Sequence, residues 1–173
     1  MPNGLRILTP GLVTHYVACQ MALTVSKELR SMQIFSTSRE LRFGDCDISG
    51  TAYFPAYLNI LNGVNEEFWA HLGYPWHDVI AKERWGTPTV HLSCDFSKPS
   101  FFGETLKFDL IVTRVGRASL TLRHKISGAD QTRWTCTQVL ASSDLESHTA
   151  KPWDDTVKSL LETWQIDTDE LPF

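Results

Sequence analysis

One amphipathic helix followed by four strand-like segments constrains the fold of this chain more than any other feature. Between residues 55 and 72, apolar side chains recur every three or four positions, the spacing of one helix face, and Gly73 ends the pattern. β-Branched and aromatic residues then fill four runs separated by glycines, at 89–96, 105–115, 119–127 and 133–142. This order predicts an α+β domain in which antiparallel hairpins form a sheet and the helix packs on one face.

Shorter segments complete the predicted domain. Residues 34–43 resemble a first strand, Pro75 begins a short helical turn through Ile80 and Ala81, and residues 152–164 predict a C-terminal helix that packs on the domain. The 173 residues suit one domain, which we place at 33–150, with 151–173 as a C-terminal helix and tail. We expect residues 1–32 to be a disordered extension or a misassigned start, because Met32 directly precedes the predicted domain.

Composition narrows the function classes. The net charge is −4 and the 16 basic residues are scattered, which argues against a protein that binds nucleic acid by neutralising phosphates. The four cysteines contain no Cys-x-x-Cys pair, so we expect reduced, buried thiols in a cytoplasmic protein and no metal site. Residues 5–25 are too polar and too broken for a membrane span. The four thiols belong to Cys19, Cys46, Cys94 and Cys136.

A short loop before the helix carries the strongest functional signal. Asp45 and Asp47 lie between glycines just before Pro55, where the helix opens. A proline at the first helical position predicts Phe54 as N-cap, with the amides of Phe54, Ala56 and Tyr57 free at the positive end of the helix dipole. Such amides suit an oxygen that becomes negative during a reaction. Gly50 permits the chain reversal that would bring the Asp47 carboxylate alongside them.

The same residues carry a resemblance to a known family. The loop resembles the signature of the 4-hydroxybenzoyl-CoA thioesterases, a branch of the hotdog-fold acyl-CoA thioesterases. The matching positions are 43–47 (Phe-Gly-Asp-Cys-Asp), Gly50, 53–55 (Tyr-Phe-Pro), Tyr57, 86–88 (Gly-Thr-Pro), 117–120 (Arg-Ala-Ser-Leu) and 123–124 (Arg-His). The resemblance covers about residues 35–145 and implies a hotdog fold, in which a curved antiparallel sheet wraps a long central helix.

The resemblance assigns roles to the loop residues. It implies that Asp47 is the nucleophile or the general base on a thioester, and that Phe54 donates its backbone amide to the oxyanion. An unperturbed aspartate is ionised at neutral pH and suits both roles, so the choice between them stays open. Asp45 is expected to tie the loop to backbone amides. Cys46 has no adjoining basic residue, so we expect a buried thiol rather than a nucleophile.

Substrate contacts follow from the same resemblance. Tyr53 and Tyr57 are predicted either to shape an acyl pocket or to pack in the core, and Asn62 and Thr87 to contact the substrate. Arg117 and Ser119 match a segment beside the pantetheine arm and nucleotide of coenzyme A. The basic cluster of the family is reduced here, so phosphate contacts could shift to another nearby cation. The nearby cations are Arg114, Arg123 and Lys125.

Three further residues have alternative interpretations. Glu66 and Glu67 are rival catalytic carboxylates, because some hotdog relatives use a helix carboxylate, although a solvated helix face is their more common fate. His91, on a predicted strand, is expected to be a core histidine.

These observations predict an acyl-CoA thioesterase that hydrolyses an aryl-CoA, such as 4-hydroxybenzoyl-CoA or a related benzoyl-type thioester, without metal or cofactor. The resemblance implies a homodimer or homotetramer in which two chains build each site. A preference for short or medium aliphatic acyl-CoA is the first alternative, although such relatives carry a histidine where this chain has Phe54. A non-catalytic module that binds acyl-CoA or acyl-carrier protein is the second. The acyl group stays open.

Overall fold

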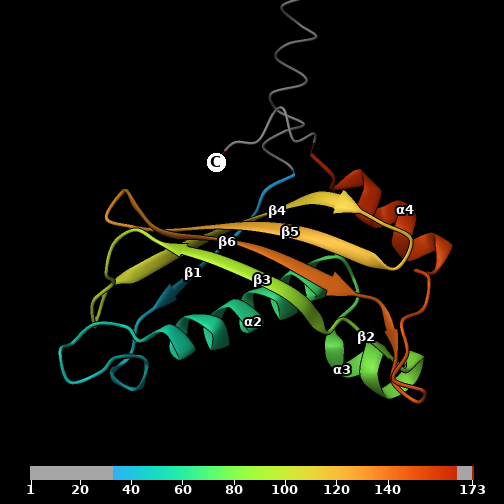
Figure 1. The fold of residues 1–173 in the computed structure, drawn as a ribbon, viewed down its shortest axis with the longest axis horizontal. Coiled ribbons are helices and arrows are strands. Elements are labelled where there is room, and N and C mark those ends of the chain that lie inside the picture. Colours follow the sequence, from blue (N-terminus) through green and yellow to red (C-terminus); the bar gives the residue numbers. More distant parts are fainter. Residues whose placement is uncertain (1–32, 167–172) are drawn as a thin grey trace, which may run out of the picture. The chain divides into compact units, whose positions relative to one another are not determined.

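The fold is built on one antiparallel sheet of five strands. In the computed structural model, which describes residues 33–166 and 173, the strand order is β1-β4-β5-β6-β3. All neighbours in this sheet are antiparallel. The bounds are β1 Phe35–Glu40, β4 Thr105–Val115, β5 Ser119–Gly128, β6 Gln131–Ala141 and β3 Thr89–Phe96. The α+β class is confirmed (Figure 1), whereas the predicted extension at 1–32, with Cys19, lies outside the described residues.

Two details of the strand prediction were wrong. The first strand ends at Glu40, not residue 43, because Phe43–Asp45 turns into the 3-10 helix η1. The hairpin prediction holds for β4–β5 and β5–β6, but β3 pairs with β6 at the sheet edge and not with β4. The β3–β4 connection instead binds the loop that precedes α2: the amide of Ala52 donates to the carbonyl of Ser100 at 2.9 Å. The connection is therefore part of the site described below.

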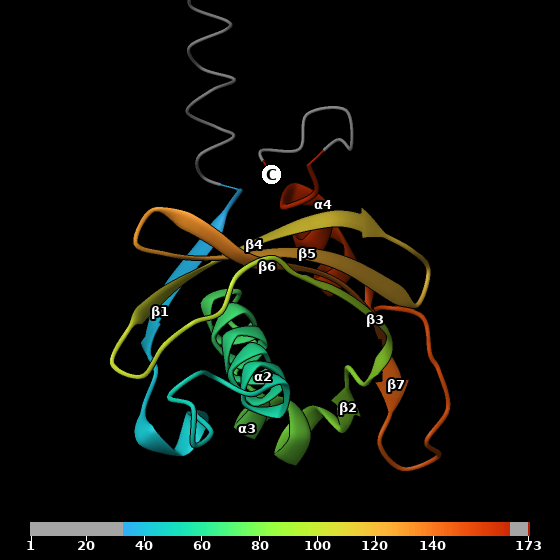
Figure 2. The ribbon, with the colours of Figure 1, turned by 60° about the vertical axis from the view of Figure 1, so that its left-hand side comes forward.

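Helix α2 (Phe54–His71) packs on one face of the sheet, which arches over it in Figure 2. It has 18 residues, and Leu61, Val64 and Phe68 are buried along the side that faces the strands. Alternate residues of β5, including Leu122 and Ile126, are buried and belong to the same core. The three-to-four-residue period of the helix and the two-residue period of the strand therefore meet in one hydrophobic core.

Gly73 ends α2 as predicted. Its φ of +88° suits glycine, and its amide donates to the Ala70 carbonyl at 3.0 Å, while the Tyr74 amide donates to the Trp69 carbonyl at 2.9 Å. These two bonds form a Schellman motif. The predicted short helical turn follows as α3 (Trp76–Asp78) and the π-helix η2 (Val79–Glu83), before strand β2 (Trp85–Gly86) pairs with β7 (Ser143–Asp144).

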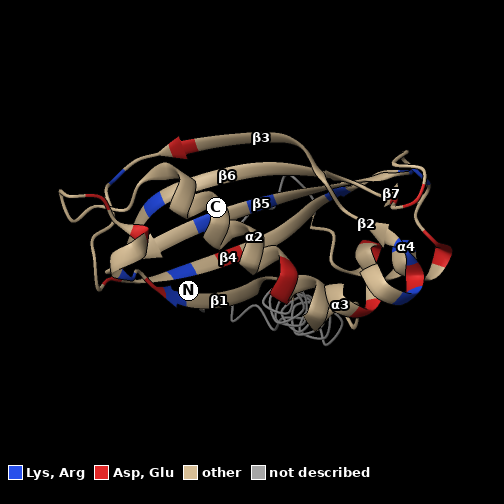
Figure 3. Ribbon diagram, turned by 90° about the horizontal axis from the view of Figure 1, so that it is seen from below, with Lys and Arg blue, Asp and Glu red and all other residues tan. Residues whose placement is uncertain are grey.

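The predicted C-terminal helix is α4 (Asp155–Thr163), which begins after an N-cap aspartate, Asp154. Val157 and Leu161 are buried, and the Trp164 ring contacts Phe68 of α2 edge-on at 5.5 Å, so the predicted packing role is confirmed. Figure 3 shows α4 at the same end of the domain as α3 and β2, with Lys and Arg residues spread along the sheet rather than gathered in one patch. Within the described part of the chain, no helix is long and apolar enough to cross a membrane.

Candidate active site

The loop that carries the two aspartates, residues 41–52, is fastened at both of its ends. We call it the Asp47 loop. The Arg42 amide donates to the Asp45 carboxylate at 2.8 Å, so the predicted tying role of Asp45 is confirmed. The Leu41 amide donates to the carbonyl of Glu104, just before β4, at 2.9 Å. The backbones of Cys46 and Ala52 pair as an isolated antiparallel β-bridge across the loop. The loop is therefore a narrow hairpin held against the start of β4.

Asp47 lies at the tip of this hairpin with an exposed carboxylate. Its Oδ1 accepts two hydrogen bonds from Ser49, one from the amide at 2.8 Å and one from the hydroxyl at 2.5 Å. These bonds, with the hydroxyl bond the larger cause, lower the pKa of Asp47 because they favour the ionised form. Gly50 makes the predicted reversal with a φ of +77°. Thr51 also lowers the pKa of Asp47, with smaller effects, so Asp47 is an ionised carboxylate at the tip of the loop.

The helix start differs from the prediction by one residue. Tyr53 is the N-cap, with extended φ and ψ of −92° and 149°, and Phe54 is already the first helical residue. Pro55 then occupies the second position, where the amide that proline lacks would also have had no partner inside the helix. The Ala56 amide is not free as predicted, because it donates to the Tyr53 carbonyl at 3.0 Å. The Phe54 amide meets no acceptor among residues 33–166, which makes it the candidate oxyanion donor.

Exposed apolar side chains surround this helix start. Phe54 is 66% exposed, and Tyr53 is also exposed. The Phe102 amide donates to the Gly50 carbonyl at 3.0 Å, which places the β3–β4 connection beside the Asp47 loop. Exposed apolar surface of this extent marks a place where a ligand or a partner binds. The other exposed members of this patch are Phe43, Ile48, Phe101 and Phe102.

Tyr57 lies one turn further along α2, inside the core. Its ring stacks on Phe96 at 5.7 Å and meets Trp134 at 5.2 Å. Because the side chain is buried, the structure gives Tyr57 a packing role, and its contact with substrate stays a prediction.

Asn62 and Thr87, predicted as substrate contacts, come together in one cavity of about 380 Å³. Asn62 reaches it from α2, eight residues or roughly 12 Å along the helix axis from Phe54. The Thr87 hydroxyl is buried and has no hydrogen-bond partner in the described chain. The cavity is otherwise lined by Trp76, Val79, Ile80, Trp85, Gly86, Pro88, Thr89 and Leu145. Three polar side chains, those of Asn62, Thr87 and Thr89, on a mostly apolar wall are typical of a small-molecule site.

Arg117 and Ser119 are not near Asp47 within one chain. The Asp47 loop is fastened beside Glu104, before the first residue of β4, whereas Arg117 follows the last. An 11-residue strand spans roughly 35 Å, and Figure 1 shows the loop and the β4–β5 turn at opposite ends of the domain. The Arg117 side chain is exposed there. Within one chain, the predicted catalytic residues therefore lie far from the predicted coenzyme A residues.

The rival groups are placed less favourably for catalysis. Glu67 forms an ion pair with Arg39 of β1, and Glu66 lies on an exposed part of α2. Burial raises the pKa of the Cys46 thiol, and the neighbouring carboxylates of Asp45 and Asp47 raise it further, so the thiolate that a nucleophile requires is disfavoured.

Some side chains of two residue types that were predicted to be buried are partly or fully exposed. His91 was predicted to be buried, but it is exposed, because β3 is an edge strand. Of the cysteines that the structure describes, Cys136 is buried, while Cys46 and Cys94 are partly buried.

A buried polar network behind the site was missed from the sequence. The Gln138 carbonyl accepts from the Asn65 amide at 3.0 Å and lies 3.2 Å from His124 Nε2, while its own amide donates to the Thr89 hydroxyl at 2.8 Å. His124 Nδ1 has no partner in the described chain. Burial lowers the pKa of His124 to about 4, so the ring is neutral at pH 7. The available signal was that His124 shares the inward-facing alternation of β5 with leucine and isoleucine.

Comparison with known proteins defines the class. The family model of the thioesterase-like superfamily matches residues 41–161, most of the chain, and the chain belongs to this family. A 1,4-dihydroxy-2-naphthoyl-CoA hydrolase of Nostoc punctiforme is 27% identical over 141 residues, covering 78% of this chain and 91% of the relative. A 4-hydroxybenzoyl-CoA thioesterase of a Pseudomonas species is 28% identical over 91 residues, 51% of this chain and 64% of the relative. The predicted class of enzyme, a thioester hydrolase, is confirmed.

Solved structures show the same fold. A 1,4-dihydroxy-2-naphthoyl-CoA thioesterase from Synechocystis superposes with a TM-score of 0.68 at 21% identity, covering 80% of this chain and 99% of that one. A 4-hydroxybenzoyl-CoA thioesterase variant complexed with 4-hydroxybenzoyl-CoA gives a TM-score of 0.70 at 18% identity, with 75% and 99% covered. The predicted hotdog thioesterase fold is confirmed by these similarities.

Proposed function

We propose that this protein hydrolyses an aryl-CoA thioester to the free acid and coenzyme A. The observation that carries the proposal is the Asp47 loop, in which an exposed, ionised carboxylate precedes a helix whose first amide, that of Phe54, has no acceptor in the described chain. The two relatives described above are named for aromatic acyl groups, which supports the aryl class.

The chemistry needs only these two groups and water. Asp47 either attacks the thioester carbonyl or takes a proton from a water that attacks it. Negative charge then develops on the carbonyl oxygen, where the Phe54 amide at the positive end of α2 stabilises it. The carbon–sulfur bond breaks, coenzyme A leaves as its thiol, and the acyl group leaves as the carboxylic acid. If Asp47 is the nucleophile, the acyl group first forms an anhydride with Asp47 and coenzyme A leaves as its thiolate. One water then hydrolyses the anhydride, one of its protons passes to the thiolate, and the Asp47 carboxylate is restored.

The cavity beside Asn62 and Thr87 is the proposed substrate-binding pocket. Its apolar wall, including Trp76 and Ile80, suits an aromatic ring, and the unpartnered Thr87 hydroxyl can bond a polar group of the substrate.

We further propose that two copies pair along β3 and share their sites. β3 is an eight-residue edge strand on which Val90, Leu92 and Phe96 are exposed, and a long apolar edge is a template for pairing with another strand. Antiparallel pairing about a two-fold axis would bring the β4–β5 end of one copy toward the Asp47 end of the other. This arrangement would supply Arg117 to a site that lacks it within one chain.

Thiol release from matched aryl and aliphatic acyl-CoA thioesters tests the substrate class. We expect benzoyl-type substrates to give the higher kcat/KM. A higher kcat/KM for short or medium aliphatic chains would replace the aryl assignment with the aliphatic one. Saturable binding without thiol release would show a binding module instead of an enzyme.

A further inference from the structure

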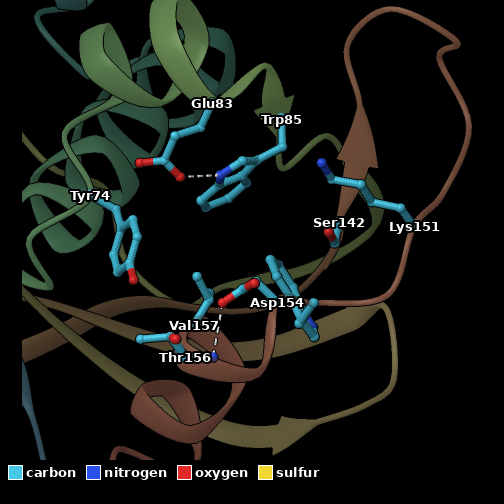
Figure 4. A pocket seen from close by; sticks show the side chains of 9 residues that line it. Tyr74, Glu83, Trp85, Ser142, Lys151, Asp154, Thr156 and Val157 are labelled. Atoms are coloured by element: carbon cyan, nitrogen blue, oxygen red, sulfur yellow. Dashed lines mark hydrogen bonds between the residues drawn. The ribbon is translucent and has the colours of Figure 1, made fainter.

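A second cavity, of about 430 Å³, lies away from the Asp47 loop and shares only Trp85 with the lining of the proposed substrate-binding pocket. It opens between the end of α2, strand β2 and the segment that leads into α4 (Figure 4). We call it the aromatic cavity. Its lining residues are Tyr74, Glu83, Trp85, Ser142, Lys151, Trp153, Asp154, Thr156 and Val157. The volume is within the range of small-molecule sites, roughly 300–1,000 Å³.

Three aromatic rings form its walls. Trp85 and Trp153 stand nearly perpendicular, with centroids 6.1 Å apart and an interplanar angle of 88°, and the Tyr74 ring lies 6.1 Å from Trp85. The Trp69 ring packs against both indoles, with its centroid 5.4 Å from that of Trp85 and 5.9 Å from that of Trp153. Trp85 and Trp153 are only 7% and 5% exposed, so the walls are held in place by packing.

Hydrogen bonds fix Trp153 further. Its backbone amide donates to the Arg117 carbonyl at 3.0 Å, and its indole N–H donates to the Ser119 carbonyl at 3.2 Å. The Trp153 side of the cavity is therefore attached to the β4–β5 turn. The positions of the aromatic rings are fixed without a ligand.

Two carboxylates on exposed residues also line the cavity. Glu83 accepts a hydrogen bond from the Trp85 indole at 2.8 Å, and Asp154 accepts one from the Thr156 amide at 2.9 Å. The second oxygen of each carboxylate has no partner among residues 33–166. Burial, followed by the charges of Glu83 and Asp154, raises the pKa of the Tyr74 hydroxyl, which places both charges near that ring.

The single cation on the wall does not cancel these charges. Lys151 lies on the side away from Tyr74 in Figure 4, and its ammonium is 4.0 Å from the carboxylate of Asp144. The cavity as a whole is therefore negative as well as aromatic.

We propose that the aromatic cavity binds a small organic cation with an alkylated ammonium group, of the choline type. Aromatic faces attract such a group through their quadrupoles, and a carboxylate without a partner adds direct attraction. The methyl groups of an alkylated ammonium also match apolar walls better than a fully hydrated metal ion does. An anionic ligand would meet two uncompensated carboxylates.

Calorimetric titration of the full chain with choline tests this proposal, with 3,3-dimethyl-1-butanol as the neutral ligand of the same shape. We expect choline to bind saturably, with at least tenfold higher affinity than the alcohol. Equal affinity, or no binding of choline at millimolar concentration, would overturn the proposal. Thiol release from acyl-CoA is measured separately, because Glu83 and Asp154 take no part in the proposed hydrolysis and either proposal can fail alone.

Two variants locate the binding. The double substitution Glu83→Gln and Asp154→Asn removes both charges but keeps an acceptor for the Trp85 indole and for the Thr156 amide. We expect it to weaken choline binding at least tenfold without loss of fold. Glu146→Gln removes a carboxylate from an exposed loop outside the cavity and should change nothing. Choline affinity unchanged in the double variant would place the cation elsewhere and contradict the assignment.

Discussion

The Ser49 hydroxyl donates to the Asp47 carboxylate at 2.5 Å, and the amide of the same serine donates to the same oxygen at 2.8 Å. Ser49 therefore satisfies Oδ1, fixes the orientation of the carboxylate and is the main cause of its lowered pKa. Ser49 also shares a 2.6 Å hydrogen bond with the Thr51 hydroxyl on the other arm of the hairpin. The hydrogen bonds of this turn, from Ser49 and to a smaller extent Thr51, therefore hold Asp47 in its ionised form.

Ser49→Ala should raise the pKa of Asp47, because it removes the largest of the causes that lower it. If the ionised form is the catalytic one, activity falls as the pH drops through this pKa, so the acidic limb of kcat/KM should move to higher pH in the variant. The pH profile of thiol release measures this shift. Ser159→Ala, on the exposed face of α4, is the matched control. An acidic limb that stays in place or moves to lower pH would contradict the assigned role of Ser49.

Phe54→Pro separates the backbone amide of Phe54 from its ring. Proline fits the first helical position, and the extended backbone of Tyr53 suits a residue that precedes proline. The variant should fold, but it should lose roughly 100- to 1,000-fold in kcat, the usual cost of one oxyanion donor. Phe54→Ala keeps the amide and should stay within a few-fold of the wild type. Similar kcat values for the two variants would exclude the Phe54 amide as oxyanion donor.

His124 should make the protein less stable in acid. Its folded pKa of about 4 is below the ordinary 6.5, so between these values the unfolded chain binds a proton that the folded chain does not. Stability is therefore fully present above about pH 6.5 and falls, by roughly 3 kcal/mol, as the pH drops to 4.

Urea unfolding across this range, compared with His124→Gln, measures the effect. The variant is expected to be less stable at every pH but to lack this part of the pH dependence. Parallel curves for the two proteins would show that His124 does not titrate as proposed.

Hydrophobic periodicity predicted most helices and strands, because the backbone geometry of each element alone determines which of its side chains share a face. The helix period located α2 to within one residue at each end, and β3 and β4 have the predicted bounds. The order of the strands in the sheet could not be predicted from these patterns. Whether β3 joins β4 or β6 depends on where the 97–104 connection binds, and that connection pairs with the Asp47 loop, which is distant in sequence.

For the candidate site, the sequence predicted which residues take part but not where they lie relative to one another. The resemblance named Asp47, Phe54, Asn62 and Thr87 as candidates, and their roles stay predictions. It did not show that Arg117 lies beyond the far end of β4. The aromatic cavity was missed altogether, because Tyr74, Trp85 and Trp153 follow no common period and meet only when the C-terminal segment packs on the end of α2. Contacts of this kind depend on tertiary packing.

Mixing two inactive variants tests the shared site. If each site takes Asp47 from one copy and Arg117 from the other, then Asp47→Asn and Arg117→Glu homodimers should both be impaired. Mixed dimers should contain one intact site. Random reassociation makes half of the dimers mixed, with one intact site in two, so about a quarter of the wild-type activity should return. Activity no higher than the sum of the separate variants would show that both residues serve the same chain or that Arg117 has no role.

The most direct test of the account is the rate of aryl-CoA hydrolysis by Asp47→Asn. The control is Asp130→Asn, at a turn residue with a φ of +58°, a conformation that asparagine also adopts readily. We predict that Asp47→Asn folds normally and loses at least about a hundredfold in kcat, whereas Asp130→Asn keeps wild-type activity. Wild-type turnover by Asp47→Asn would contradict the central claim that the Asp47 carboxylate carries the reaction.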